Sequence, residues 1–156
     1  MEGLGAILAV SGAFAAAVLG GIGSTLGVGA AGKAGAGVTA EKPEAFGKLL
    51  VLTALPGSQG IYGLIGAFLI TVFFDIANLT TSQGWQIFFA SMPLAITALF
   101  SGIFQGKVAV AGAQIVAKNP AEGGKAIVLA AIVETFAILG LLATFLLFNN
   151  IKGSIG

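Results

Sequence analysis

One acidic residue, Glu134, stands inside a long apolar segment that reads Ala-Ile-Val-Glu-Thr-Phe-Ala from position 131. It lies about eight residues, or roughly 12 Å of helix, into that segment. If the segment spans a bilayer, a charged carboxylate at this depth costs about 2.5–3.5 kcal/mol or more. Glu134 must therefore be protonated, paired with a cation or directed at a polar site. Acidic residues inside membranes usually mark ion pathways, so Glu134 is the first candidate for function.

Other polar residues lie at a similar depth. Four positions of an earlier apolar segment are spaced i, i+3, i+4 and i+7, which places them on one helix face: Leu55, Ser58, Gln59 and Tyr62. Pro56 has no backbone donor, which leaves a carbonyl in the preceding turn without its helical partner. Gln105 adds another amide from a third segment. Carboxylate, hydroxyl and amide oxygens suit a hard cation, whereas a proton needs only the carboxylate.

The composition predicts that these residues lie in a membrane. The chain has 156 residues, of which 57% are hydrophobic and 8% are charged, and its mean hydropathy is +1.05. A water-soluble domain of this size has a far more charged surface. The absence of Cys and His excludes disulfides, thiol catalysis and Ser-His or Cys-His nucleophiles. A net charge of +1 gives no indication of a nucleic-acid partner.

Four apolar segments are long enough to span a bilayer as helices, because each has about 20 residues or more. The expected spans are 4–32, 49–74, 86–117 and 126–148. None shows the alternation of a barrel strand, which predicts an all-α membrane protein. Three connections are expected to separate the spans, with Lys33 and Lys48 in the first, Trp85 at the end of the second, and Lys118 and Lys125 in the third. The N-terminus lacks a basic region, so we expect the first segment to remain as a helix rather than to be a signal peptide.

The two halves of the chain repeat each other with an offset of 77 positions. Pairs related by this offset include Pro43 and Pro120, Lys48 and Lys125, Gly35 and Gly112, Ser24 and Ser101, and Phe68-Leu69 and Phe145-Leu146. The repeat predicts two fused helical hairpins, residues 1–75 and residues 76–156, with the carboxylate in the second. An even number of spans separates the repeats, so they are expected to run in the same direction. The offset maps Glu134 onto Gly57, which predicts one acid for two hairpins.

Six of the seven lysines lie near the two within-hairpin loops, and the middle connection has only Asp75 as a charged residue. The positive-inside rule therefore places both hairpin loops in the cytoplasm and both termini outside. Glycine pairs such as Gly23-x-x-x-Gly27 and Gly102-x-x-x-Gly106 predict close helix packing. The glycine-rich stretch at 27–33 resembles nucleotide-binding motifs in spacing but lies in a membrane helix, so we expect no nucleotide site.

The duplicated hairpins and three sequence stretches resemble the membrane rotor subunit (proteolipid, or K subunit) of vacuolar-type ATPases, and particularly its sodium-translocating bacterial members. The stretches are residues 56–63 (PGSQGIYG), 100–107 (FSGIFQGK) and 133–138 (VETFAI). The resemblance implies a homo-oligomeric ring in a bacterial cell membrane that turns against a stator subunit with an essential arginine. It implies a central-stalk subunit bound at the cytoplasmic loops, and no catalytic site in this chain.

The resemblance also implies which residues hold the ion. Glu134 would bind one Na⁺ together with the side chains of Ser58, Gln59 and Gln105 and the Leu55 carbonyl. Tyr62 would hydrogen-bond the carboxylate. Ser58 replaces the Thr that is usual in the family and keeps the hydroxyl group. Ion binding would neutralise the carboxylate while the ring turns, in a machine that hydrolyses or makes ATP.

Three other functions are compatible with the sequence. A proton-carrying ring would use the same acid, but it needs no set of neutral oxygen ligands. A small ion-coupled exporter could also use one membrane acid, but it needs an aromatic substrate cavity where this chain has glycine. A purely structural proteolipid leaves the polar helix face without a role.

Overall fold

The computed structural model describes residues 3–155, and within that range four helical spans are long and apolar enough to cross a membrane. Three of them are continuous helices: α1 (Leu4–Glu41), α4 (Thr81–Lys118) and α5 (Gly123–Ile155). The second span is divided into α2 (Phe46–Ala54), a short 3₁₀ turn η2 (Leu55–Gly57) and α3 (Ser58–Phe73). Met1 and Glu2, the start of the stretch that we expected to stay as helix, lie outside the described residues.

The helices extend beyond the expected apolar spans. We expected the first span to end near residue 32, but α1 continues to Glu41, and Lys33 therefore lies in a helix. The same correction applies to the other charged or aromatic residues that were assigned to loops, namely Lys48 in α2, Trp85 and Lys118 in α4, and Lys125 in α5. Lys and Glu are good helix formers, so a helix does not end where its apolar residues end.

Proline and capping residues set the actual helix ends. Pro43 and Pro120 begin the short 3₁₀ turns η1 (Pro43–Ala45) and η4 (Pro120–Glu122), in equivalent places of the two hairpins. Proline is favourable at a first helical position because its missing N–H has no helical partner there. A third turn, η3 (Ile76–Asn78), precedes Thr80, which caps α4 in a reciprocal capping box with Gln83.

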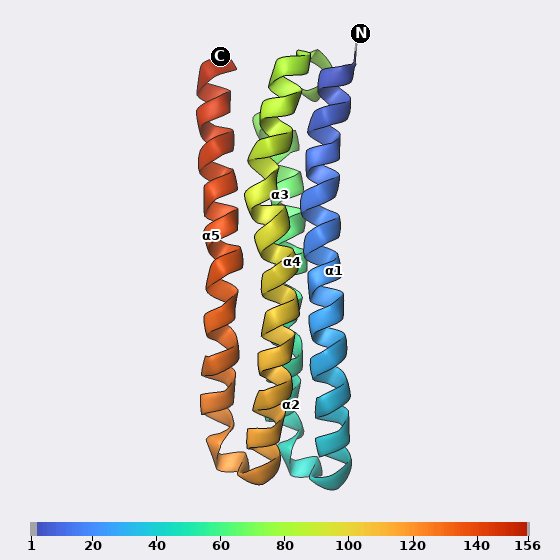
Figure 1. Cartoon of the computed structure of the whole chain (residues 1–156), viewed down its shortest axis with the longest axis vertical. Coiled ribbons are helices and arrows are strands. Elements are labelled where there is room, and N and C mark those ends of the chain that lie inside the picture. The colour runs from blue at the N-terminus through green and yellow to red at the C-terminus, as the bar shows by residue number, and fades with distance from the viewer. Residues whose placement is uncertain (1–2, 156) are drawn as a thin grey trace.

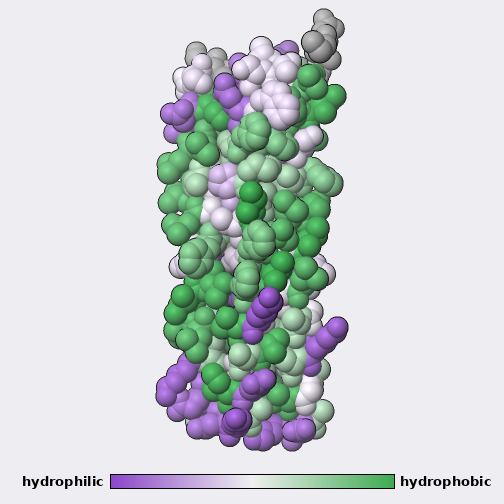
Figure 2. Space-filling view, viewed as in Figure 1, coloured by the Kyte–Doolittle hydropathy of each residue, from purple (hydrophilic) through white to green (hydrophobic). Residues whose placement is uncertain are grey.

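The spans form an elongated bundle with the two within-hairpin turns at one end and the chain termini at the other (Figure 1). We call the first the turn end and the second the terminal end. Both hairpins run in the same direction, as the repeat predicted. On the face shown in Figure 2, hydrophilic side chains gather at the turn end and apolar side chains cover most of the middle of the bundle. This distribution is the one expected of a protein whose solvent is lipid.

Helices α1 and α4 meet through their backbones. A Cβ atom placed on Gly106 would lie 2.4 Å from Cα of Gly27, and one on Gly102 would lie 2.5 Å from the carbonyl carbon of Gly23. Real Cβ contacts are essentially never this short, so only glycine fits at these positions. The prediction of close packing through these glycine pairs is confirmed. In lipid, small residues supply the contact that hydrophobic burial supplies in water.

Candidate ion-binding site

The 3₁₀ turn η2 shapes one wall of the site. Pro56 is buried and interrupts the helical hydrogen bonding between α2 and α3. The turn brings the Ser58 hydroxyl to the Leu55 carbonyl, with a hydrogen bond of 3.1 Å from Oγ to the carbonyl oxygen. Two oxygen atoms of the predicted ligand set are therefore neighbours, one from the backbone and one from a side chain.

A buried amide network links the second span to the fourth across α4. Gln59 and Gln105 are both fully buried, and Gln59 Nε2 donates to Gln105 Oε1 at 2.6 Å. The same Nε2 donates to the Ser101 hydroxyl at 3.1 Å. Gln105 Nε2 and Ser101 Oγ then donate to backbone carbonyls of α5, those of Ala130 at 3.2 Å and Val133 at 2.9 Å. The last of these carbonyls belongs to the residue before Glu134.

The network leaves one oxygen atom without a partner. Gln59 Oε1 is buried and accepts no hydrogen bond from any of the described residues. Leaving a polar atom buried and unsatisfied costs about 1–3 kcal/mol, so native proteins rarely do so without a reason. Both amide hydrogens of Gln59 are used in the network, which fixes this oxygen as an acceptor. The oxygen can accept a hydrogen bond or bind a cation.

Glu134 lies beside this network on α5. Its Oε1 accepts a hydrogen bond of 2.5 Å from the Tyr62 hydroxyl on α3. The ion pair found among the described residues is Lys125–Glu122, so Glu134 has no basic partner among them. The carboxylate is partly buried and borders an open groove of about 510 Å³, whose other walls come from α2, η2 and α3. A carboxylate in this position can be neutralised by a proton or by a small cation.

The structure brings the predicted residues together in three hydrogen-bonded pairs: Gln59 with Gln105, Tyr62 with Glu134, and Ser58 with Leu55. No hydrogen bond joins Glu134 to either glutamine among the described residues. Sequence reasoning missed the part played by Ser101, which connects the network to α5. The signal was present in its spacing, because Ser101 lies four residues before Gln105 and so on the same helix face.

Comparison with known proteins identifies the type of chain. The family of the ATP synthase C subunit matches it twice, over residues 11–70 and residues 88–147, with the offset of 77 positions found in the repeat. "V-type sodium ATPase subunit K" of Enterococcus hirae is 49% identical over 146 residues, which cover 94% of this chain and 93% of that protein. "A-type ATP synthase subunit K" of Methanocaldococcus jannaschii is 41% identical over 151 residues, which cover 96% of this chain and 66% of that longer protein. The chain is therefore an integral membrane protein that belongs to the family of the ATP synthase C subunit, with the family domain present twice.

Proposed function

We propose that the chain is a rotor-ring subunit that binds one Na⁺ at Glu134 and carries it past a stator during ATP-coupled rotation. The observation that carries this proposal is the buried Gln59 Oε1, which lacks a donor in a network that is otherwise satisfied. The ligands are the Glu134 carboxylate, Gln59 Oε1, Gln105 Oε1, the Ser58 hydroxyl and the Leu55 carbonyl. Five oxygen atoms with a single negative charge match a monovalent hard cation.

Charge neutralisation is the physical basis of the transport step. A bare carboxylate is costly in hydrocarbon, whereas a carboxylate that holds Na⁺ has no net charge and can face lipid as the ring turns. The Tyr62 hydroxyl holds one carboxylate oxygen, so that the group keeps a fixed orientation on the outer side of the bundle. A stator arginine would displace the ion by pairing with the freed carboxylate. Moving one charge across 100 mV is worth about 2.3 kcal/mol, so several ions must be coupled to each ATP.

The repeat and the charge distribution support an arrangement for the whole subunit. We propose that residues 1–75 and residues 76–156 act as two hairpin units with a single ion site between them. The turn end, which carries Lys42, Lys48 and Lys125, faces the cytoplasm and contacts the central stalk, and the termini lie outside. The relative from Enterococcus hirae is named as part of a sodium ATPase, which supports Na⁺ as the ion and a bacterial cell membrane as the location.

Chemical modification of the carboxylate tests the identity of the ion. A hydrophobic carbodiimide is expected to label Glu134, and Na⁺ is expected to slow that labelling at neutral pH because the ion occupies the carboxylate. K⁺ at the same concentration serves as the control, and mass spectrometry locates the label. Labelling that depends on pH but is indifferent to Na⁺ would assign the ring to protons instead.

Replacement of the carboxylate tests its role as carrier. Glu134→Gln keeps the shape of the side chain and a hydrogen-bond acceptor for Tyr62, but it cannot lose or balance a charge. We expect the variant to assemble normally and to lose ion transport, measured as ²²Na⁺ uptake into vesicles that contain the whole ATPase. Transport that survives in this variant would exclude Glu134 as the ion carrier.

A further inference from the structure

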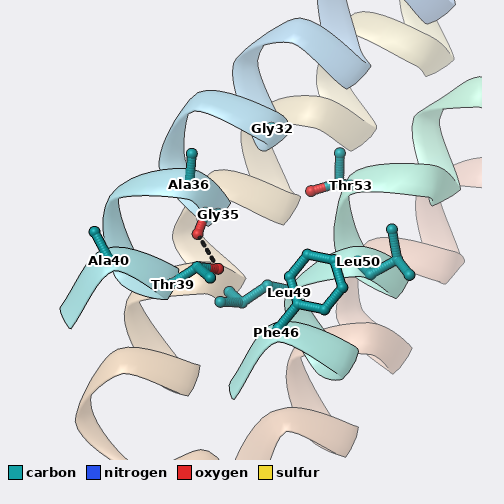
Figure 3. A pocket seen from close by; sticks show the side chains of 9 residues that line it. All are labelled: Gly32, Gly35, Ala36, Thr39, Ala40, Phe46, Leu49, Leu50 and Thr53. Carbon is teal, nitrogen blue, oxygen red and sulfur yellow. Dashed lines mark hydrogen bonds between the residues drawn. The ribbon is translucent and has the colours of Figure 1, made fainter. Parts of the chain in front are cut away.

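A groove of about 480 Å³ opens between α1 and α2 near the turn end (Figure 3). Small residues of α1 form one side of it, and larger side chains of α2 form the other. Its rim includes Phe46 and Leu50, which are 54% and 53% exposed. The groove is lined by Gly32, Gly35, Ala36, Thr39, Ala40, Phe46, Leu49, Leu50 and Thr53.

The duplicate of this groove, 77 positions later in the chain, is filled. Five of the lining positions correspond to residues of α4 and α5 that are exposed by 2% or less: Ala109, Ala113, Val116, Ala126 and Ala130. These five belong to one apolar cluster with residues of the first hairpin, including Leu49 and Leu52. The first hairpin therefore covers this surface of the second hairpin, whereas the equivalent surface of the first hairpin is left open.

Leu52 is the side chain that enters the filled groove. It is 1% exposed, and its Cδ2 atom lies 3.2 Å from the position that a Cβ atom would take on Gly112. The equivalent of Gly112 in the open groove is Gly35, and the equivalent of Leu52 is Leu129. Leu129 is 52% exposed on α5. The chain thus has an open groove and an exposed leucine at the positions whose duplicates pack together.

A polar contact shows the same difference between the two hairpins. The Lys48 amine donates to the carbonyl of Pro120, which ties the first hairpin to the turn of the second. The equivalents of these residues are Lys125 and Pro43. The side chain of Lys125 is 76% exposed and, among the described residues, pairs with Glu122 of η4, so its amine has hydrogens to donate elsewhere.

We propose that the groove of Figure 3 is the socket for a second copy of the chain, with Leu129 of one copy inserted against Gly35 of the next. At the same joint the Lys125 amine donates to the Pro43 carbonyl of the next copy. This joint uses different surfaces on the two copies, and repetition of such a contact closes a ring when the rotation divides a full turn. The inference rests on the proposed ring and adds the surfaces and the register by which its members meet.

Cysteine cross-linking tests the joint without background, because the chain has no cysteine. The pair Leu129→Cys and Gly35→Cys is introduced into one chain, and membranes that contain it are treated with a short bifunctional thiol reagent. We expect a ladder of bands at multiples of 15.4 kDa on a denaturing gel. The matched control combines Leu129→Cys with Gly37→Cys, because position 37 lies on the opposite side of α1 and has open space around it.

A second control shows that the reagent spans the distance. Leu52→Cys with Gly112→Cys is expected to react within one copy, so both thiols are lost while the band stays at 15.4 kDa. If this pair reacts and the unaltered chain purifies as a large assembly, absence of the ladder overturns the proposed joint and leaves the ring standing. A ladder of equal strength from the Gly37 control also overturns it. An unaltered chain that purifies as single copies overturns the ring and the joint together.

Truncation of the inserted side chain gives an independent measurement. Leu129→Ala is expected to lower the temperature at which the detergent-purified assembly releases single chains. Leu142→Ala is the control, because Leu142 is also on α5 and 50% exposed, whereas its duplicate Ile65 stays 39% exposed within the chain. Equal effects of the two substitutions would contradict a specific role for Leu129.

Discussion

At the residue scale, the proposed ion site depends most on the amide oxygen of Gln59. Its own Nε2 is held by Gln105 and Ser101, so the amide cannot turn to satisfy the oxygen without breaking two hydrogen bonds. Hydrogen bonds to charged groups are worth about 1.5–3 kcal/mol, and we expect a contact between the amide oxygen and a cation to be of similar size. The amide network therefore holds a buried, unsatisfied acceptor in a fixed orientation, as the proposed cation site requires.

Substitution of Gln59 measures what its amide oxygen contributes to the proposed binding of Na⁺. Gln59→Leu is expected to raise, by about tenfold to a hundredfold, the Na⁺ concentration that half-protects Glu134 from carbodiimide, since one ligand to a charged ion is lost. Gln114→Leu makes the same change on the exposed face of α4 and should leave the protection curve unaltered. An unchanged curve for Gln59→Leu would remove this amide from the ion site.

At the scale of the elements, the contact between α1 and α4 depends on the absence of side chains. Gly106→Ala would place a methyl group 2.4 Å from Cα of Gly27 and force the two helices apart. Overpacking of this kind costs about 1–3 kcal/mol, so a lower unfolding temperature in detergent is expected. Gly37→Ala, with nothing within 4 Å of its new Cβ, is the control. Equal thermal stability of both variants would show that the contact is not close-packed in the membrane.

The sequence alone was sufficient to predict the elements whose length is set by the thickness of the bilayer. Apolar length gave the four spans, and the offset of 77 positions gave their pairing into hairpins of the same direction. It was insufficient where the end of a helix is set by water-exposed residues, as for α1, which runs on to Glu41. It also could not assign donors and acceptors, because the unsatisfied oxygen of Gln59 depends on which neighbours the folded helices bring to its nitrogen.

At the scale of the whole molecule, both hairpin turns lie at the same end of the bundle (Figure 1). If that end faces the cytoplasm, thiols introduced at the two ends will react with impermeant reagents from opposite sides. Ala121→Cys, in the exposed turn η4, is expected to be labelled in inverted membrane vesicles and protected in protoplasts. Ala77→Cys, in the exposed turn η3, is its matched counterpart and should give the reverse pattern. Labelling of both from one side would contradict the topology.

The direct meeting of the α1 and α4 backbones has a mechanical consequence. Because backbone meets backbone at these glycines, with no rotatable side chains between the two helices there, we expect α1 and α4 to resist sliding past each other. The repeat does not preserve this contact, because the equivalents of Gly23 and Gly27 are Phe100 and Phe104, which are about half exposed. If copies assemble into the proposed ring, we expect the joints between copies to yield to a twist before the contact between α1 and α4 within one copy does.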